Sequence, residues 1–344
     1  MLKLTRTPLL FICLCAAVLT VLASVAGAHQ RSALHHPKGT VWVVNRDAGE
    51  VTAFDAASGD VEATVPTGPG AHEVAISRRT RQAYVTNEFE NTISILSTRT
   101  LASRKIALGP QPHHAEPSRD GRNVVVGLVG TNKVGLIDTA TDATRQFFSS
   151  ANVAARAHSG YLSRGTIYVP HETGNEVSAI NIETGAIEWS VGNIVQASEV
   201  LPERRKNVLY VTARGEGKVK AIDLSSHAIV GEVAVGTQPE GMLLTRDRGT
   251  LIVTLRGTPA QLAFVDTETM TLSGTVALAG AGTFGDLAAM SKDGRFVYAT
   301  FDRTASGTGG VAVVDMSGRS VVDTWAYPGV GRPHGIAWTS TKLR

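Results

Sequence analysis

The feature that most constrains the fold is a unit of about forty residues that recurs seven times along the chain. One copy, YVTNEFENTISILSTRTLASRKIALG, begins at Tyr84. The residue that closes the third apolar run of each unit marks the period, and successive marks are 42, 41, 43, 42, 43 and 49 residues apart. These marker residues are Asp55, Ser97, Asp138, Asn181, Asp223, Asp266 and Asp315. The spacing is typical of β-propeller blades, and we expect the marker side chains to accept backbone hydrogen bonds in turns.

Within each unit, short runs rich in Val, Ile, Tyr and Thr alternate with Gly, Asn, Asp and Ser, and no long segment has a helical period. We therefore predict an all-β fold, a seven-bladed β-propeller of four-stranded blades, as a single domain over residues 39–344. The C-terminal RPHGIAWTS matches the first strand of a unit, whereas GTVWVVNRD near the start matches the second. We expect the two ends to complete one blade together, which leaves no open sheet edge.

The segment AYVTNEFENTISILST, preceded by HEVAIS, resembles the YVTN β-propeller repeat family of exported proteins. The resemblance covers residues 39–344, but the YVTN motif is intact only at 84–87. It implies a propeller fold in the periplasm or at the cell surface, and some propellers of this general type serve as periplasmic zinc chaperones. It implies no particular activity, because this fold hosts many functions.

Residues 1–28 resemble a secretory signal peptide, with Lys3 and Arg6 before an apolar run and small residues up to Ala28. A membrane anchor is the alternative interpretation of the same run. Cleavage would remove both cysteines, Cys13 and Cys15, and leave 31 basic residues (33 minus Lys3 and Arg6) against 30 acidic ones. We expect a periplasmic or secreted protein without thiolate ligands or a nucleic-acid-binding surface, and a flexible, histidine-containing segment at 29–38.

Aligning the first predicted strand of every unit brings a column of polar residues into register. The column reads His72, His113, His158, Ser198, Glu240, Asp286 and His334. Innermost strands line the central channel of a propeller, so we expect these side chains to form a ring at one mouth of it. Closure makes His334 the neighbour of His72, which places the four histidines on four consecutive blades.

The second predicted strand of each unit runs back to the same mouth. His171 ends this strand in the unit that also contains His158, and we expect it as a fifth imidazole. Arg214 and Arg256 follow the corresponding strands on the other side of the ring. There they could bind an anionic ligand or cofactor, or pair with the two carboxylates of the column.

Imidazoles with a carboxylate and no thiolate favour zinc or copper(II). We predict a metal site drawn from the column residues other than Ser198, with His171 as a further candidate. The alternative is that these polar side chains only bond to neighbouring blades around a water-filled channel. His114 follows His113 directly, and adjacent strand residues face opposite sides, so we expect His114 to support the site from between the blades, near Glu73 or Glu199.

Three classes of function stay open. The first is an exported propeller that binds zinc or copper in metal carriage or storage. The second is a metal-dependent enzyme, a copper oxidoreductase or a lactonase-like hydrolase, whose catalytic residues the sequence does not identify. The third is a scaffold that binds a periplasmic protein partner without small-molecule chemistry. A metal carrier that is not an enzyme is the prediction that the histidine column favours.

Overall fold

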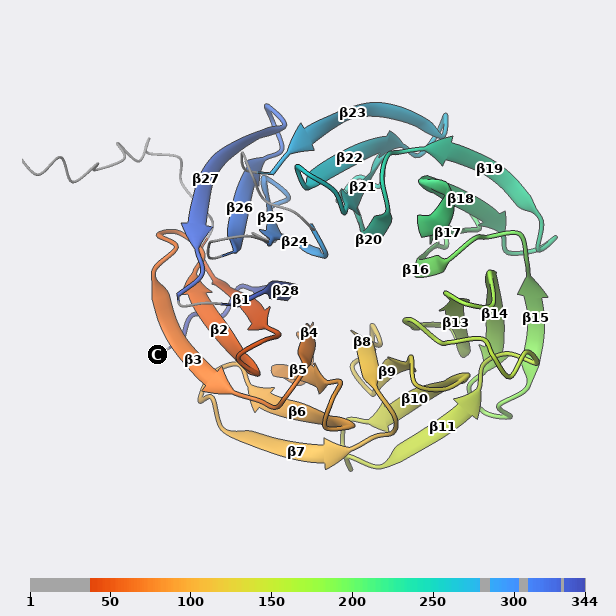
Figure 1. Cartoon of the computed structure of the whole chain (residues 1–344), viewed down its shortest axis with the longest axis horizontal. Helices are drawn as coiled ribbons and strands as arrows, with labels where there is room; N and C mark the ends of the chain where they lie inside the picture. The colour runs from red at the N-terminus through yellow and green to blue at the C-terminus, as the bar shows by residue number, and fades with distance from the viewer. Residues whose placement is uncertain (1–37, 279–284, 303–308, 329–330, 344) are drawn as a thin grey trace, which may run out of the picture. The chain divides into compact units, whose positions relative to one another are not determined.

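The chain forms a seven-bladed β-propeller, seen in a computed structural model that describes residues 38–278, 285–302, 309–328 and 331–343. Each blade is a four-stranded antiparallel sheet, and the innermost strand of each blade contacts that of the next around the ring (Figure 1). The predicted fold class is confirmed. The predicted signal segment and the histidine-containing segment lie outside the described residues, except for Lys38.

The strands are listed by blade, from the innermost strand outward. The first three blades comprise β28 (Pro333–Thr339), β1 (Thr40–Asn45), β2 (Glu50–Asp55) and β3 (Val61–Pro66); β4 (Ala71–Ser77), β5 (Gln82–Asn87), β6 (Thr92–Ser97) and β7 (Ser103–Ala107); and β8 (Pro112–Pro117), β9 (Asn123–Leu128), β10 (Lys133–Asp138) and β11 (Thr144–Phe148).

The remaining blades comprise β12 (Tyr161–Ser163), β13 (Thr166–His171), β14 (Glu176–Asn181) and β15 (Ile187–Val191); β16 (Ala197–Glu203), β17 (Val208–Ala213), β18 (Lys218–Asp223) and β19 (Ile229–Ala234); β20 (Pro239–Leu244), β21 (Thr250–Leu255), β22 (Gln261–Asp266) and β23 (Thr271–Ala277); and β24 (Ala288–Met290), β25 (Phe296–Phe301), β26 (Gly310–Asp315) and β27 (Ser320–Ala326). The 3-10 helix η1 (Arg214–Glu216) is the one helix among the described residues.

Burial explains why the apolar runs become middle strands. β1 is buried at every position and β2 at four of six, whereas the outermost β3 is half exposed. Neighbouring blades pack face to face, so their middle strands are covered on both sides and need no polar alternation. One such interface joins Tyr84 and Ile95 of one blade to Val124 and Val126 of the next.

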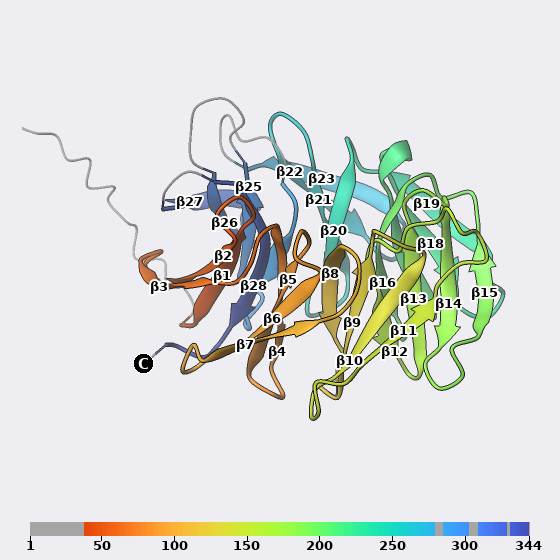
Figure 2. The same ribbon diagram turned by 60° about the horizontal axis from the view of Figure 1, so that its bottom comes forward.

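The ring closes where the chain's two ends meet. β28 pairs antiparallel with β1, so the last strand becomes the innermost strand of the blade that contains the first. Figure 2 shows β28 among the other inner strands. The marker residues behave as expected: Asp138, for example, accepts hydrogen bonds from the backbone N–H groups of Ala140 and Thr141, at 3.0 and 2.9 Å. These aspartates are turn residues of the fold.

Candidate metal centre

The structure places the predicted column at one end of the innermost strands. Five column residues lie in β28, β4, β8, β16 and β20, whereas His158 lies three residues before β12 and Asp286 two residues before β24. The register of each strand with its partner decides which neighbours of the column also face the channel.

A β-bulge repeats beside the column. On β8, Pro112 pairs with Leu128 and Ala115 with Val126, so His113 and His114 together lie opposite the single residue Gly127. The same shift occurs on β28, β4, β16 and β20. A bulge of this kind breaks the alternation of a strand and lets consecutive side chains point to one side. The expectation that alternation separates His113 from His114 is therefore wrong.

In three blades a threonine opposite the bulge bonds to the neighbouring blade. Thr86 accepts a hydrogen bond from the Glu73 N–H, at 3.1 Å, and donates one to the His113 carbonyl, at 2.6 Å. Thr212 and Thr254 repeat the arrangement. These bonds fix the backbone on which the column side chains stand.

The four column histidines form a row across four blades. The ring centroid of His72 lies 3.7 Å from that of His113 and 4.0 Å from that of His334, and His113 lies 4.4 Å from His158. His114 joins this row: its ring stacks on His113 with centroids 4.6 Å apart and an interplanar angle of 9°. The structure thus brings five imidazoles together.

His114 also contacts the carboxylates expected near it. Its Nδ1 hydrogen-bonds to Glu199 and lies 3.9 Å from Oε2 of Glu73. Burial alone would lower the pKa of His114, but these two carboxylates outweigh burial and raise the pKa to about 10. Burial raises the pKa of Glu73 to about 7, opposed by His114. In the metal-free protein, His114 is therefore an imidazolium.

His72 and His113 are neutral. Burial, and then the charges of neighbouring histidines, hold the pKa of each well below its ordinary value. Nδ1 of His72, Nδ1 of His113 and Nε2 of His114 are buried and have no hydrogen-bond partner. We call these three residues the imidazole side of the ring. A buried polar atom without a partner costs free energy, which a ligand can recover.

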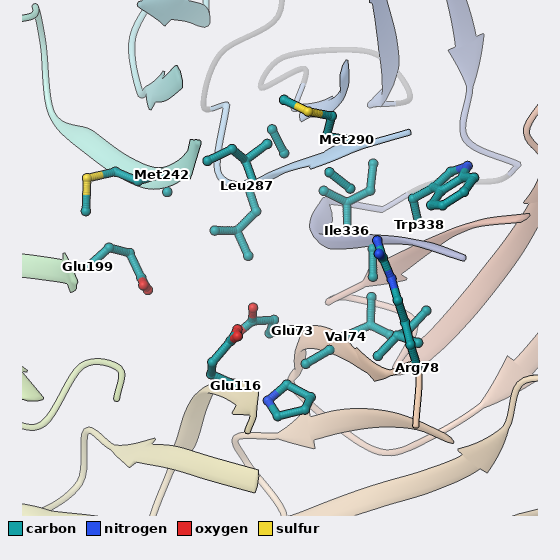
Figure 3. A pocket seen from close by; sticks show the side chains of 18 residues that line it. Glu73, Val74, Arg78, Glu116, Glu199, Met242, Leu287, Met290, Ile336 and Trp338 are labelled. Carbon is teal, nitrogen blue, oxygen red and sulfur yellow. The ribbon is translucent and has the colours of Figure 1, made fainter. Parts of the chain in front are cut away.

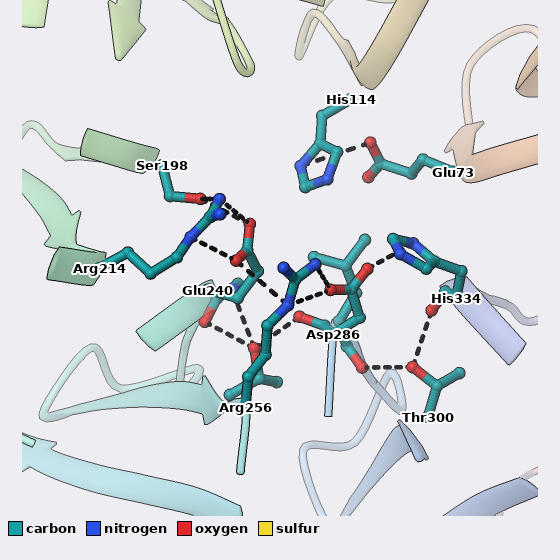
Figure 4. A network of polar contacts seen from close by, with 12 residues as sticks. Glu73, His114, Ser198, Arg214, Glu240, Arg256, Asp286, Thr300 and His334 are labelled. Carbon is teal, nitrogen blue, oxygen red and sulfur yellow. Dashed lines mark hydrogen bonds and ion pairs between the residues drawn. The ribbon is translucent and has the colours of Figure 1, made fainter. Parts of the chain in front are cut away.

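The opposite part of the ring is filled by ion pairs. Arg214 Nε lies 3.0 Å from Glu240 Oε2, and Arg256 Nε donates a 2.8 Å hydrogen bond to Asp286 Oδ1 (Figure 4). Arg256 Nε also lies 3.4 Å from Glu240 Oε2. Burial would raise the pKa of Asp286, but Arg256 and His334 hold it well below its usual range. We call Arg214, Glu240, Arg256 and Asp286 the arginine side.

Two column histidines lie at the border between these sides. Nε2 of His158 is 2.9 Å from an Arg214 Nη, and its Nδ1 is 2.9 Å from the Ser198 carbonyl. Both ring nitrogens of His158 are therefore engaged. His334 contacts Asp286 through Nδ1 (Figure 4). Of the two roles considered for the arginines, the structure shows the pairing with column carboxylates.

The structure does not bring His171 to the row. Its Nε2 lies 3.0 Å from the Ser149 carbonyl and 3.0 Å from Ser178 Oγ. Burial lowers the pKa of His171 to about 4. Its Nε2 is therefore engaged, and in the described part of the chain no ring contact or candidate ligand group includes it.

Three groups of side chains in the described residues offer ligand atoms within 4.8 Å of one another. They are His72, His113 and His114; His72, Asp286 and His334; and His114, His158 and Glu199. The first group consists of the three residues of the imidazole side, each of which has a ring nitrogen without a hydrogen-bond partner. This donor set suits zinc or copper(II). Sequence reasoning missed His114 as a possible ligand, although consecutive polar residues opening an inner strand were a signal of the bulge.

No known family model matches the chain, and neither does any curated protein sequence. Solved structures resemble it in fold. A functionally unknown protein from Desulfotomaculum acetoxidans is 14% identical, with a TM-score of 0.71 and coverage of 87% of this chain and 98% of that one. Kuenenia stuttgartiensis hydrazine synthase is 16% identical, with a TM-score of 0.68 and coverage of 85% and 99%.

Apo AztD from Citrobacter koseri is 11% identical, with a TM-score of 0.66 and coverage of 88% of this chain and 98% of that one. Identities this low support the propeller fold alone. Among the described residues, no helix has the length and apolar character needed to cross a lipid bilayer. Seven closed blades and a buried histidine cluster therefore define this protein as a β-propeller with a candidate metal centre.

Proposed function

We propose that this protein is an exported carrier or store of a transition metal ion, zinc or copper(II), which binds to the imidazole side of its channel mouth. The observation that carries the proposal is that His72, His113 and His114 offer ligand atoms within 4.8 Å of one another, and each has a buried ring nitrogen without a hydrogen-bond partner. A closed site of protein ligands suits carriage or storage. Export is inferred from the signal-like residues 1–28.

The other predicted ligands have different roles in this proposal. His334 and Asp286 flank His72 and are suited to complete the coordination shell. His158 and Glu240 are held by Arg214 and are less available. His171 is left out, because the Ser149 carbonyl and the Ser178 hydroxyl engage its Nε2.

Glu199 orients His114 for this role. Its carboxylate accepts a hydrogen bond from Nδ1, which leaves Nε2 as the atom directed at the metal. Carboxylates commonly hold metal-binding histidines in this way and increase the basicity of the ligand. Because His114 is protonated in the metal-free protein, metal binding should displace a proton.

The pairing of the arginines favours carriage over catalysis. An enzyme acting on an anionic substrate would use Arg214 or Arg256 to bind it, but both already pair with buried carboxylates. The resemblance to exported YVTN propellers supports the same assignment, because some propellers of this general type serve as periplasmic zinc chaperones.

Metal analysis of protein purified without a histidine tag tests the proposal. We expect about one equivalent of zinc or copper per chain, and loss of that metal in a His72→Ala/His113→Ala double variant. His227→Ala is the matched control, because His227 is an exposed histidine stacked on Trp189. Equal metal content in the double variant and the control would overturn the proposal, provided that both variants keep the wild-type circular dichroism spectrum.

A further inference from the structure

A cavity of about 310 Å³ lies in the central channel, adjoining the imidazole side (Figure 3). The inner strands β4, β8, β16, β20 and β28 line it, together with β24 and the preceding Leu287. Its volume is at the lower end of the range for small-molecule sites. It shares Glu73 and Glu199 with the surroundings of His114 but extends along the strands away from the column.

The lining combines two kinds of chemistry. Three carboxylates face the cavity, those of Glu73, Glu116 and Glu199 (Figure 3). The apolar part of the wall is formed by Met242, Leu243, Leu287, Met290 and Ile336. A ligand that matches this lining needs a cationic head and an apolar body.

In the described part of the chain, His114 is the one cation that contacts these carboxyl groups. His114 hydrogen-bonds to Glu199 and lies beside Glu73, so one cation serves two anions. In the described part of the chain, Glu116 has no hydrogen bond or ion pair. Arg78 also lines the cavity, but its guanidinium lies over the Trp338 ring, 5.8 Å from the centroid. The carboxyl group of Glu116 is therefore available to a ligand in the cavity.

A single metal ion does not fit this arrangement. The oxygens that bind one ion must lie within a few ångströms of each other, and in the described residues no two of these carboxylates share a candidate ligand group. An alkylammonium ion can donate hydrogen bonds to one or two of these carboxyl groups and place its carbons against the apolar wall, which a bare metal ion cannot cover.

We infer that this cavity is a binding site for a short aliphatic amine, with its ammonium group among Glu73, Glu116 and Glu199 and its hydrocarbon chain against the methionine, leucine and isoleucine side chains. The inference does not require the proposed metal function, because Glu116 and the apolar wall belong to the cavity alone. Hexylamine is a suitable probe, since it joins one ammonium group to six carbons.

Calorimetric titration with hexylamine, hexanol and hexanoate tests the charge requirement. We expect hexylamine to bind at least about tenfold more tightly than hexanol, as one charge-assisted contact provides, and hexanoate not to bind. Equal binding of hexanol and hexylamine would overturn the inference, because the cavity would then be selecting only for apolar volume. So would an absence of hexylamine binding.

Two variants localise the site. Glu116→Gln should weaken hexylamine binding about tenfold and leave the metal content unchanged, whereas His113→Ala should lower the metal content and leave hexylamine binding intact. Met242→Lys places an ammonium group in the cavity, and should abolish hexylamine binding and raise the melting temperature. Unchanged hexylamine affinity in both cavity variants would overturn the inference, while metal loss in His113→Ala reports separately on the metal proposal.

Discussion

The imidazole side and the arginine side of the ring are similarly buried, yet only the arginine side is filled by ion pairs. His72 and His114 are 1% and 3% exposed, and Glu240 and Asp286 are 0% and 2% exposed. On the arginine side, opposite charges meet within hydrogen-bonding distance. On the imidazole side, three ring nitrogens have no partner. Burial alone does not mark a binding site; buried groups without partners that lie within reach of one another do.

The difference assigns the two sides separate tasks. Ion pairs whose members are desolvated together are part of the folded structure, and removing one member leaves a bare charge in the interior. The neutral imidazoles of His72 and His113 lose less by being buried and keep a lone pair for a ligand, and His114 gains one when it gives up its proton. The ring therefore combines a structural half with a half that is suited to bind.

The largest expected effect is on the arginine side. Arg256→Met should lower the free energy of unfolding by about 3–5 kcal/mol, because Asp286 and Glu240 would lose a buried cation. His113→Leu, in contrast, removes an unpartnered polar ring and should change stability by about 1 kcal/mol or less. Urea denaturation of metal-free protein measures both. Equal losses would show that the two sides do not differ as described.

Metal should stabilise the protein through the imidazole side. At a free zinc concentration about 100 times the dissociation constant, the free energy of unfolding should rise by about 2.7 kcal/mol. The His72→Ala/His113→Ala variant should lose this gain, measured as a zinc-dependent melting temperature. A gain that persists in the variant would place the metal elsewhere.

The contact from Glu199 to His114 should tune metal affinity. Glu199→Gln is expected to weaken zinc binding about 10- to 100-fold, because the amide holds and polarises the imidazole less well. The matched control is Glu172→Gln, which changes a carboxylate that pairs with Arg214, at 3.1 Å. Competition with a chromogenic chelator distinguishes the two variants, and equal affinities would exclude a role for Glu199.

Mild acid should act on buried histidines before it acts on the arginine side. The folded pKa of His171, about 4, lies below its ordinary value of 6.5, so the unfolded chain binds the proton more readily. Stability is then present above pH 6.5 and falls as the pH drops toward 4, by about 1.4 kcal/mol between pH 7.5 and 5.5 from this residue. Asp286, with its pKa held well below the ordinary 3.8, stays charged throughout this window.

Urea midpoints at the two pH values, compared between the wild type and His171→Asn, isolate this contribution. The variant should lose less stability on acidification than the wild type does. An equal loss would mean that His171 is not buried in its neutral form.

The fold and the column were accessible from the sequence for a simple reason. A propeller repeats one unit, so the marker residues, such as Asp55 and Asp138, fix the register of every blade. The predicted column residues accordingly lie at equivalent places in or just before the inner strands. Closure by β28 and β1 followed from the way the unit is divided between the chain's ends.

The position of His114 was not accessible by the same reasoning. Period-two alternation assumes a regular strand, and the bulge opposite Gly127 breaks it in the backbone. The partners of Arg214 and the isolation of His171 were also beyond the pattern, because they depend on side-chain directions across blades. Repeated pairs of polar residues, as in His72–Glu73 and His113–His114, were the available hint.

The joining of β28 to β1 has a consequence for the timing of metal uptake. His334 reaches His72 only when the last strand has docked against the first, so the row of histidines is incomplete in any chain whose ring is still open. A metal ion bound beside His72 and His334 would link the last strand, β28, to the neighbouring blade. The complete metal site would then exist only in a fully folded chain. Bound metal would slow the opening of the ring, and the closed ring would slow the release of the metal.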